Sequence, residues 1–152
     1  MKQSSISDVE LGLMCSKPLA LLGLRGLVIG VDLSSDLLER AQKNAEMASA
    51  TNVKFVLAPI TDIPLESGIA DCVISNCVIN LLLTKDKFVC FQDIFRQLKP
   101  GGRLAITDTL AKKPIPTKLQ EDMALYVRCI SGASLVSHYE EWLKQAGFQG
   151  KL

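Results

Sequence analysis

A strand pattern followed at once by a helix pattern most limits what this chain can fold into. The run LVIGVD at 27–32 is a short β-branched segment that ends in Asp32. The next run, SSDLLERAQKNAEMA at 34–48, gathers its apolar residues on one helical face, and Ser34 or Ser35 can cap it. Together they predict one βα step of a parallel sheet.

The same alternation continues along the chain. Strand patterns recur at VKFVLA (53–58), DCVISNC (71–77) and RLAITDTL (103–110), with a loop at 60–68. A helix with the apolar stripe Phe88, Phe91, Phe95 and Leu98 is stopped by KPGG. Two further helices are predicted, one beginning at Pro116 and one announced by a capping box from Ser137 to Glu140 and closed by Gly147. These periods indicate a parallel sheet with helices on its faces.

The length of 152 residues suits a single domain, 1–152, made of an N-terminal segment (1–26), a parallel βα core (27–110) and C-terminal helices (111–152). A formal charge of +1 gives no electrostatic reason to expect a nucleic-acid partner. The longest apolar stretch, from Leu19 to Val31, is interrupted by three glycines and Arg25, so no membrane span is expected. The polar start lacks a secretory h-region, which favours a cytoplasmic protein with reduced cysteines.

Five cysteines stand at 15, 72, 77, 90 and 129. They contain no C-x-x-C pair, and the single histidine, His138, is far along the chain, so a structural zinc site has little support. The default interpretation of each cysteine is a small buried hydrophobe.

In a doubly wound sheet, ligands bind outside the carboxyl ends of the strands. Asp32 ends one predicted strand, where its carboxylate can accept both hydroxyls of a ribose; helping to cap the next helix is an equal alternative. Asp62 and Ile63 follow the next strand and could flank an adenine, although a turn role for Asp62 is also open. Asn76 and Cys77 close the DCVISNC strand, beside the place where the reacting end of such a cofactor would lie.

Several segments together resemble one known family. They are VIGVDLSSDLLERAQKNA, DCVISNCVINL, FRQLKPGGRLAITDTLAKKPIP, ALYVRCISGAS and YEEWLKQAGF. This set is similar to the arsenite methyltransferases, and the likeness runs from about residue 11 to residue 148. LKPGG marks the whole methyltransferase superfamily, whereas SNCVINL with YxxCIxGA is far more specific. The resemblance implies an α/β fold, the three-layer Rossmann-like sheet of class I methyltransferases.

The resemblance also implies a site and its partners. S-adenosylmethionine would be the cofactor, with Asp32, Leu33, Asp62, Ile63 and Asn76 around it. The substrate would be arsenite or thiol-bound arsenic, held by Cys15, Cys77 and Cys129, because trivalent arsenic is soft and prefers thiolates. A thiol reductant would restore trivalent arsenic after methyl transfer. Cys72 and Cys90 match no family ligand and are expected to pack in the core.

One part of the family pattern is not found in the sequence. Class I methyltransferases open with a strand and a glycine-rich loop of the form VLDLGxGxG, and around Cys15 the residues Met14, Ser16 and Lys17 replace glycine, glycine and asparagine. We therefore expect an incomplete sheet, lacking the first βα unit and the last hairpin. Its central gap would expose strand edges unless the N-terminal segment fills it.

Two other functions remain open at this point. The chain could be another small-molecule methyltransferase that uses S-adenosylmethionine, in which Cys77 and Cys129 are structural. It could also be a thiol protein without catalytic activity, which sequesters arsenite and needs no cofactor.

Overall fold

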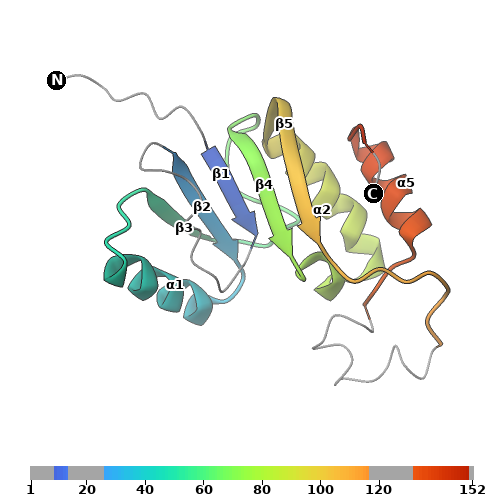
Figure 1. The fold of residues 1–152 in the computed structure, drawn as a ribbon, viewed down its shortest axis with the longest axis horizontal. Coiled ribbons are helices and arrows are strands. Elements are labelled where there is room, and N and C mark those ends of the chain that lie inside the picture. Colours follow the sequence, from blue (N-terminus) through green and yellow to red (C-terminus); the bar gives the residue numbers. More distant parts are fainter. Residues whose placement is uncertain (1–8, 14–25, 117–131, 151–152) are drawn as a thin grey trace.

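The computed structural model describes residues 9–13, 26–116 and 132–150 (Figure 1). These residues form one five-stranded sheet in the order β3-β2-β1-β4-β5, and every neighbouring pair is parallel. The strands are β1 (Val9–Leu13), β2 (Leu27–Asp32), β3 (Val53–Leu57), β4 (Ala70–Asn76) and β5 (Leu98–Thr107). The helices are α1 (Ser35–Met47), α2 (Thr84–Gln97), α5 (Val136–Ala146) and the short 3₁₀-helix η1 (Ile79–Leu81).

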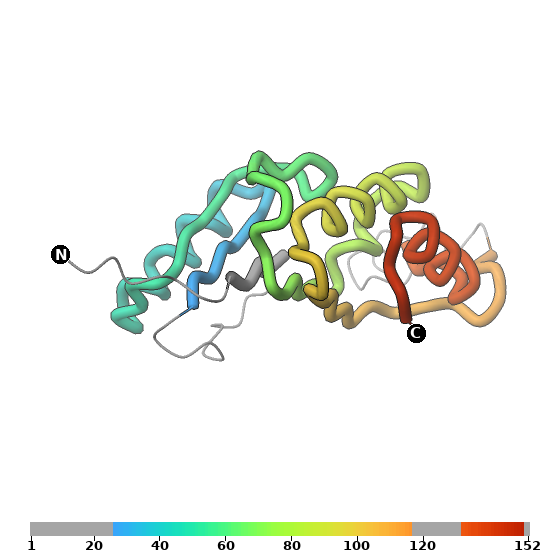
Figure 2. The backbone as a smooth tube through the Cα atoms, turned by 90° about the horizontal axis from the view of Figure 1, so that it is seen from above, coloured from blue at the N-terminus to red at the C-terminus, as the bar shows by residue number. Residues whose placement is uncertain are grey.

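The helices lie on opposite faces of this sheet. The β2-α1-β3 connection steps away from the centre in one direction, and the β4-α2-β5 connection steps away in the other. Because such crossovers are right-handed, their helices must lie on opposite faces. Figures 1 and 2 show α1 on one side and α2 with α5 on the other. The strand order reverses between β1 and β4, which is where an open α/β sheet forms its binding crevice.

The N-terminal segment occupies the centre of the sheet. Val9–Leu13 pairs with β2 through Val9↔Leu27 to Leu13↔Val31, and with β4 through Glu10↔Cys72 to Leu13↔Ser75. The α/β fold is confirmed, and the N-terminal segment fills the central gap, as the expectation of an incomplete sheet had allowed. Without this segment β2 and β4 would each have an unpaired edge, so the strand pairing that stabilises the sheet depends on it.

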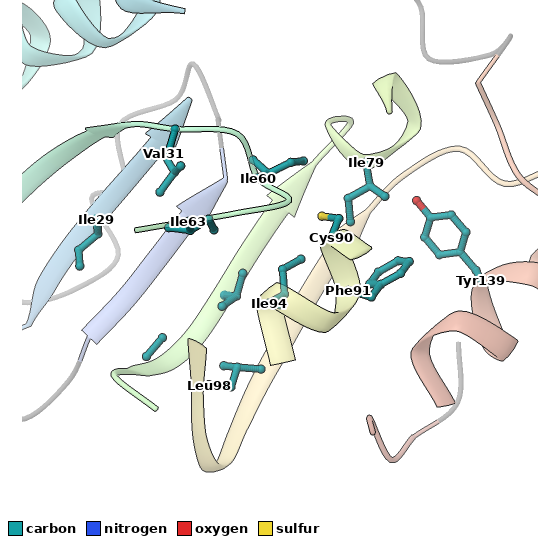
Figure 3. Packing of buried hydrophobic residues seen from close by; sticks show 13 residues of the cluster. Ile29, Val31, Ile60, Ile63, Ile79, Cys90, Phe91, Ile94, Leu98 and Tyr139 are labelled. Carbon is teal, nitrogen blue, oxygen red and sulfur yellow. The ribbon is translucent and has the colours of Figure 1, made fainter. Parts of the chain in front are cut away.

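The core lies between the sheet and α2. Ile29 and Val31 of β2 and Val73 of β4 are buried in one cluster with residues of α2, η1 and α5. Figure 3 shows Ile79, Cys90, Phe91 and Tyr139 of this cluster near one another. The rings of Phe91 and Tyr139 meet edge to face, with centroids 5.3 Å apart, which orients α5 against α2.

The buried face of α2 differs from the stripe expected from its phenylalanines. Phe95 is 44% exposed and packs edge-on against Phe148. The buried residues of the helix include three polar ones, Lys87, Asp93 and Gln97. The expected stripe is therefore right for Phe91 and Leu98, which are buried, and wrong for Phe95.

Two polar residues of α2 anchor the loop between β3 and β4. Asp93 Oδ2 accepts a hydrogen bond from the Ile63 backbone N–H at 3.0 Å. Arg96 donates to the backbone oxygens of Ile63 and Leu65, each at 2.8 Å, and is paired with Asp93 at 2.7 Å. The loop backbone, which has no strand partner, thus finds its hydrogen bonds on the helix.

Helix ends follow the sequence in two places and differ in a third. Ser34 caps α1, with its side chain accepting from the Leu37 N–H, and Gly147 ends α5 in a left-handed conformation at φ 108°. The capping box predicted from Ser137 is wrong, because α5 begins at Val136 and its N-cap, Leu135, makes no side-chain cap. β5 also begins earlier than predicted, at Leu98, and ends at Thr107.

The central place of β1 can be tested with Leu11→Pro. Proline cannot donate to the ladder, and a central strand tolerates it poorly. We expect a loss of roughly 3 kcal/mol or more in the free energy of unfolding, comparable to proline in a helix interior. Urea unfolding followed by circular dichroism measures it. An unchanged midpoint would mean that residues 9–13 do not form the middle of the sheet.

Candidate functional site at the carboxyl edge of the sheet

The parallel strands direct their carboxyl ends to one edge, and the predicted cofactor residues stand along it. Asp32 ends β2 and is half-buried; its Oδ1 accepts the Ser34 backbone N–H at 2.6 Å. Ser34, not Asp32, is the N-cap of α1, while Asp32 fixes the turn that leads into the helix. Leu33 beside it is 67% exposed, an apolar side chain in contact with solvent at this edge.

The other predicted cofactor residues divide between surface and core. Asp62 is exposed, and its backbone N–H closes a turn onto Pro59. The Ile63 side chain is only 1% exposed and belongs to the core, while its backbone is bonded to α2. Asn76 is the last residue of β4 and is exposed. The edge therefore presents Asp32, Leu33, Asp62 and Asn76, whereas Ile63 anchors the loop that carries Asp62.

Cys77 stands just beyond β4 in an unusual conformation. It is exposed, and its φ of 55° lies in the left-handed region that side chains other than glycine rarely adopt. Its backbone N–H donates to the Thr107 oxygen at the end of β5, at 2.9 Å. The chain thus holds a thiol outward at the strand-order reversal at a conformational cost of about 1–2 kcal/mol.

Cys15 and Cys129 lie outside the described residues, which end at Leu13 before the first and resume at Gly132 after the second. Leu13 is paired with Ser75 in the sheet, and Cys15 and Cys77 follow these two residues by two positions each. On the other side, Gly132 lies directly against η1: a Cβ on it would stand 1.9 Å from the Asn80 backbone oxygen. Only glycine allows that approach.

Beneath Cys77 lies a set of buried polar side chains that the sequence did not point to. We call it the polar network; its members are Asn80, Lys87, Asp108, Ser134 and Tyr139. The Tyr139 hydroxyl donates to Asp108 Oδ2 at 2.8 Å and lies 3.4 Å from Asn80 Oδ1. Asn80 Nδ2 donates to the Thr109 backbone oxygen at 2.6 Å. These bonds tie η1 and α5 to the chain that leaves β5.

Lys87 forms the other half of the polar network. It is 1% exposed, and its ammonium donates to Ser134 Oγ at 2.8 Å and to the Gly132 oxygen. Burial lowers the pKa of Lys87 to about 8, an effect that the nearby charge of Asp108 opposes. Between pH 8 and the usual lysine pKa the unfolded chain binds the extra proton more strongly, so the Lys87 contribution to stability falls as the pH drops through that window.

Burial also dominates the titration of Asp108 and Cys90. It raises the pKa of Asp108, against the lowering effects of Tyr139, Lys87 and the backbone N–H groups of Asn80 and Cys77. Asp108 Oδ1 is buried without a hydrogen-bond donor among the described residues. The pKa of Cys90 rises to about 12, first through burial and then through Asp93 and Asp108.

The described cysteines other than Cys77 behave as packing residues. Cys72 is 6% exposed and Cys90 is fully buried, which confirms the expectation for both. Within the ranges that the structure describes, no three histidine, cysteine or acidic side chains gather closely enough to hold a metal ion. In the same ranges no helix has the length and apolar character needed to cross a bilayer.

The sequence and the fold match known methyltransferases. The model of the methyltransferase domain family matches residues 14–147. The arsenite methyltransferase of Halobacterium salinarum is 38% identical over 128 residues, covering 84% of this chain and 32% of that protein. The human arsenite methyltransferase is 33% identical over 123 residues, covering 74% of this chain and 32% of that protein. The chain thus spans about a third of the length of these curated relatives.

A solved structure agrees with these relatives. The crystal structure of an arsenic(III) S-adenosylmethionine methyltransferase from Chlamydomonas reinhardtii superposes with a TM-score of 0.78 at 26% identity, covering 93% of this chain and 52% of that one. The chain belongs to the methyltransferase domain family, and its sheet has the class I methyltransferase fold.

The contact between Gly132 and η1 can be tested with Gly132→Ala. The added methyl would clash with the Asn80 backbone, so the segment must move away from η1. We expect a loss of about 1–3 kcal/mol in the free energy of unfolding, as for overpacking elsewhere. Urea unfolding gives the value, and equal stability of the two proteins would contradict the close approach.

Proposed function

We propose that this chain is the core of an arsenite methyltransferase, which transfers a methyl group from S-adenosylmethionine to trivalent arsenic bound by Cys15, Cys77 and Cys129. The motifs SNCVINL and YxxCIxGA and the arsenite methyltransferases among its relatives support the proposal. Reduced thiols as ligands fit a cytoplasmic protein.

The observation that carries the proposal is the sheet register next to two of these cysteines. Leu13 and Ser75 are directly paired, and Cys15 and Cys77 each stand two residues further along neighbouring parallel strands. Two residues span at most about 7 Å, so the register supports a site at this edge that both cysteines can reach. The N-terminal strand, which the sequence pattern did not predict, is what supports this pairing of thiols.

The contact of Gly132 with Asn80 supports the third ligand. Cys129 precedes Gly132 by three residues, and Cys77 precedes Asn80 by three residues. Three residues reach at most about 11 Å, so the described chain on either side is compatible with a Cys129 thiol within reach of Cys77. The sheet register and the contact with η1 therefore both support the proposal that three thiols share one ion.

The cofactor residues fit the nucleoside end of S-adenosylmethionine. Asp32 would accept ribose hydroxyls at the end of β2, Leu33 offers an exposed apolar surface beside it, and Asp62 and Ile63 belong to the loop proposed for the adenine end. Asn76 stands next to Cys77 and is proposed for the methionine end. Of the form VLDLGxGxG, β1 keeps Gly12, while Met14 and Ser16 take the places of the following glycines.

The chemistry assigned to these residues is mainly positioning. Three thiolates fix trivalent arsenic with its lone pair open to the crevice, so no general base is needed. When bound, S-adenosylmethionine supplies a sulfonium methyl group and keeps the electron pair of the broken carbon–sulfur bond. Arsenic gives two electrons to the new bond and becomes pentavalent; an external dithiol returns two electrons as it closes to a disulfide.

The replacement of the loop glycines favours one alternative, a thiol protein that binds arsenite and no cofactor. Calorimetry separates it from the proposal, because the proposal requires binding of both arsenite and S-adenosylmethionine. Binding of the cofactor without arsenite would instead indicate another small-molecule methyltransferase.

Cys77 can be tested with a pair of variants. Cys77→Ser leaves at most two thiolates, so we expect arsenite affinity in calorimetry to fall roughly a hundredfold or more through lost chelation. Cys77→Gly should lose affinity equally but keep or slightly raise thermal stability, because glycine relieves the left-handed backbone. Near-normal arsenite affinity in either variant would exclude Cys77 as a ligand.

Asp32 can be separated from the helix cap by a matched control. Asp32→Ala should weaken S-adenosylmethionine binding about 10- to 100-fold, the usual effect of losing hydrogen bonds to a charged group. Ser34→Ala removes the N-cap of α1 but keeps the carboxylate, so its cofactor affinity should stay within about twofold of the unaltered chain. Equal losses in both variants would make Asp32 only a part of the helix start.

A further inference from the structure

The left-handed conformation of Cys77 requires support from its surroundings. Such a residue persists only where neighbouring structure over-determines it. Here the support comes from three consecutive residues at the carboxyl end of β5, Thr107 to Thr109. The Thr107 oxygen accepts the Cys77 N–H and the Thr109 oxygen accepts Asn80 Nδ2, so Asp108 stands between two residues that hold the turn.

Asp108 is itself held in place from α5. The Tyr139 hydroxyl donates to its Oδ2 at 2.8 Å, and Tyr139 is fully buried, with its ring packed edge-on against Phe91. Since the tyrosine ring is fixed by the core, its hydroxyl fixes Asp108, which directly follows Thr107, the acceptor of the Cys77 N–H. A chain of contacts thus runs from α5 to the thiol.

We propose that Tyr139 and Asp108 are positioning residues for the Cys77 thiol, acting through the turn 77–81. This inference rests on the proposed function, because a fixed thiol direction matters only where several thiols must meet on one atom. A single thiol reacting alone would not need it. Asn80 helps to hold the same turn, since its side chain is bonded to Thr109 and its backbone lies against Gly132.

The charges around Asp108 come from each element packed against it. Lys87 of α2 is the nearby cation, and Tyr139 of α5 is the hydrogen-bond donor. Cys90 of α2 stays a neutral thiol because burial, Asp93 and Asp108 all raise its pKa.

The test compares Tyr139→Phe with Trp142→Phe. Both residues lie on α5 and their rings are neighbours, with centroids 6.0 Å apart, but only Tyr139 reaches Asp108. For Tyr139→Phe we expect arsenite affinity to fall about tenfold, faster amide hydrogen exchange at 77–82, and Cys77 alkylation by iodoacetamide within about twofold of the unaltered chain. Trp142→Phe should change none of the three.

Several outcomes would overturn the proposal. Unchanged arsenite affinity with unchanged exchange at 77–82 would do so, and so would lost affinity accompanied by alkylation of Cys90, because that means general unfolding. If Tyr139→Phe does not fold, Asp108→Asn replaces it in the test. The same results are expected, because the substituted side chain at position 108 is neutral at every pH. Should the unaltered chain fail to bind arsenite, the proposed function fails, while hydrogen exchange at 77–82 still decides whether Tyr139 holds the turn.

Discussion

The pairing of β1 with both β2 and β4 is the constraint on which the rest of the structure depends. A parallel sheet leaves no choice about where its strands end: once the register is set, every carboxyl end lies at one edge. Because the two crossovers leave the centre in opposite directions, the strand order reverses between β1 and β4, where open α/β sheets bind their ligands. A short N-terminal segment therefore determines both the stability of the sheet and the location of the site.

The βα core could be predicted from periodicity because its signals are local. The β-branched run of β2 and the serine cap of α1 appear in the structure as the sequence indicates. β1 was missed because Val9–Leu13 is short and the glycines expected after it are replaced, so nothing local marked it as a strand. Its role comes from pairing with residues far away in the sequence, which periodicity does not report.

The candidate site divides in the same way. Motifs located Cys77 and the residues at the strand ends, whereas Lys87, Asp108 and Tyr139 gave no signal, because a lysine or an aspartate is expected at the surface. Lys87 is buried and Asp108 half-buried because each finds its partner in another element: Lys87 in the 132–134 segment, Asp108 in α5. Lys87 lies on the same face of α2 as the buried Phe91 and Ile94, and this position in the helix is a sequence signal of its inward orientation.

The contact of Gly132 with Asn80 sets a constraint on how relatives of this chain can vary. The backbones touch at one point, and the chain leading to it from each cysteine is only a few residues long. Under the proposed function, adding or removing a single residue on either side would shift one thiol away from the shared ion. Side chains along 77–80 and 129–132 can then change during evolution, whereas the lengths of the two stretches must stay constant.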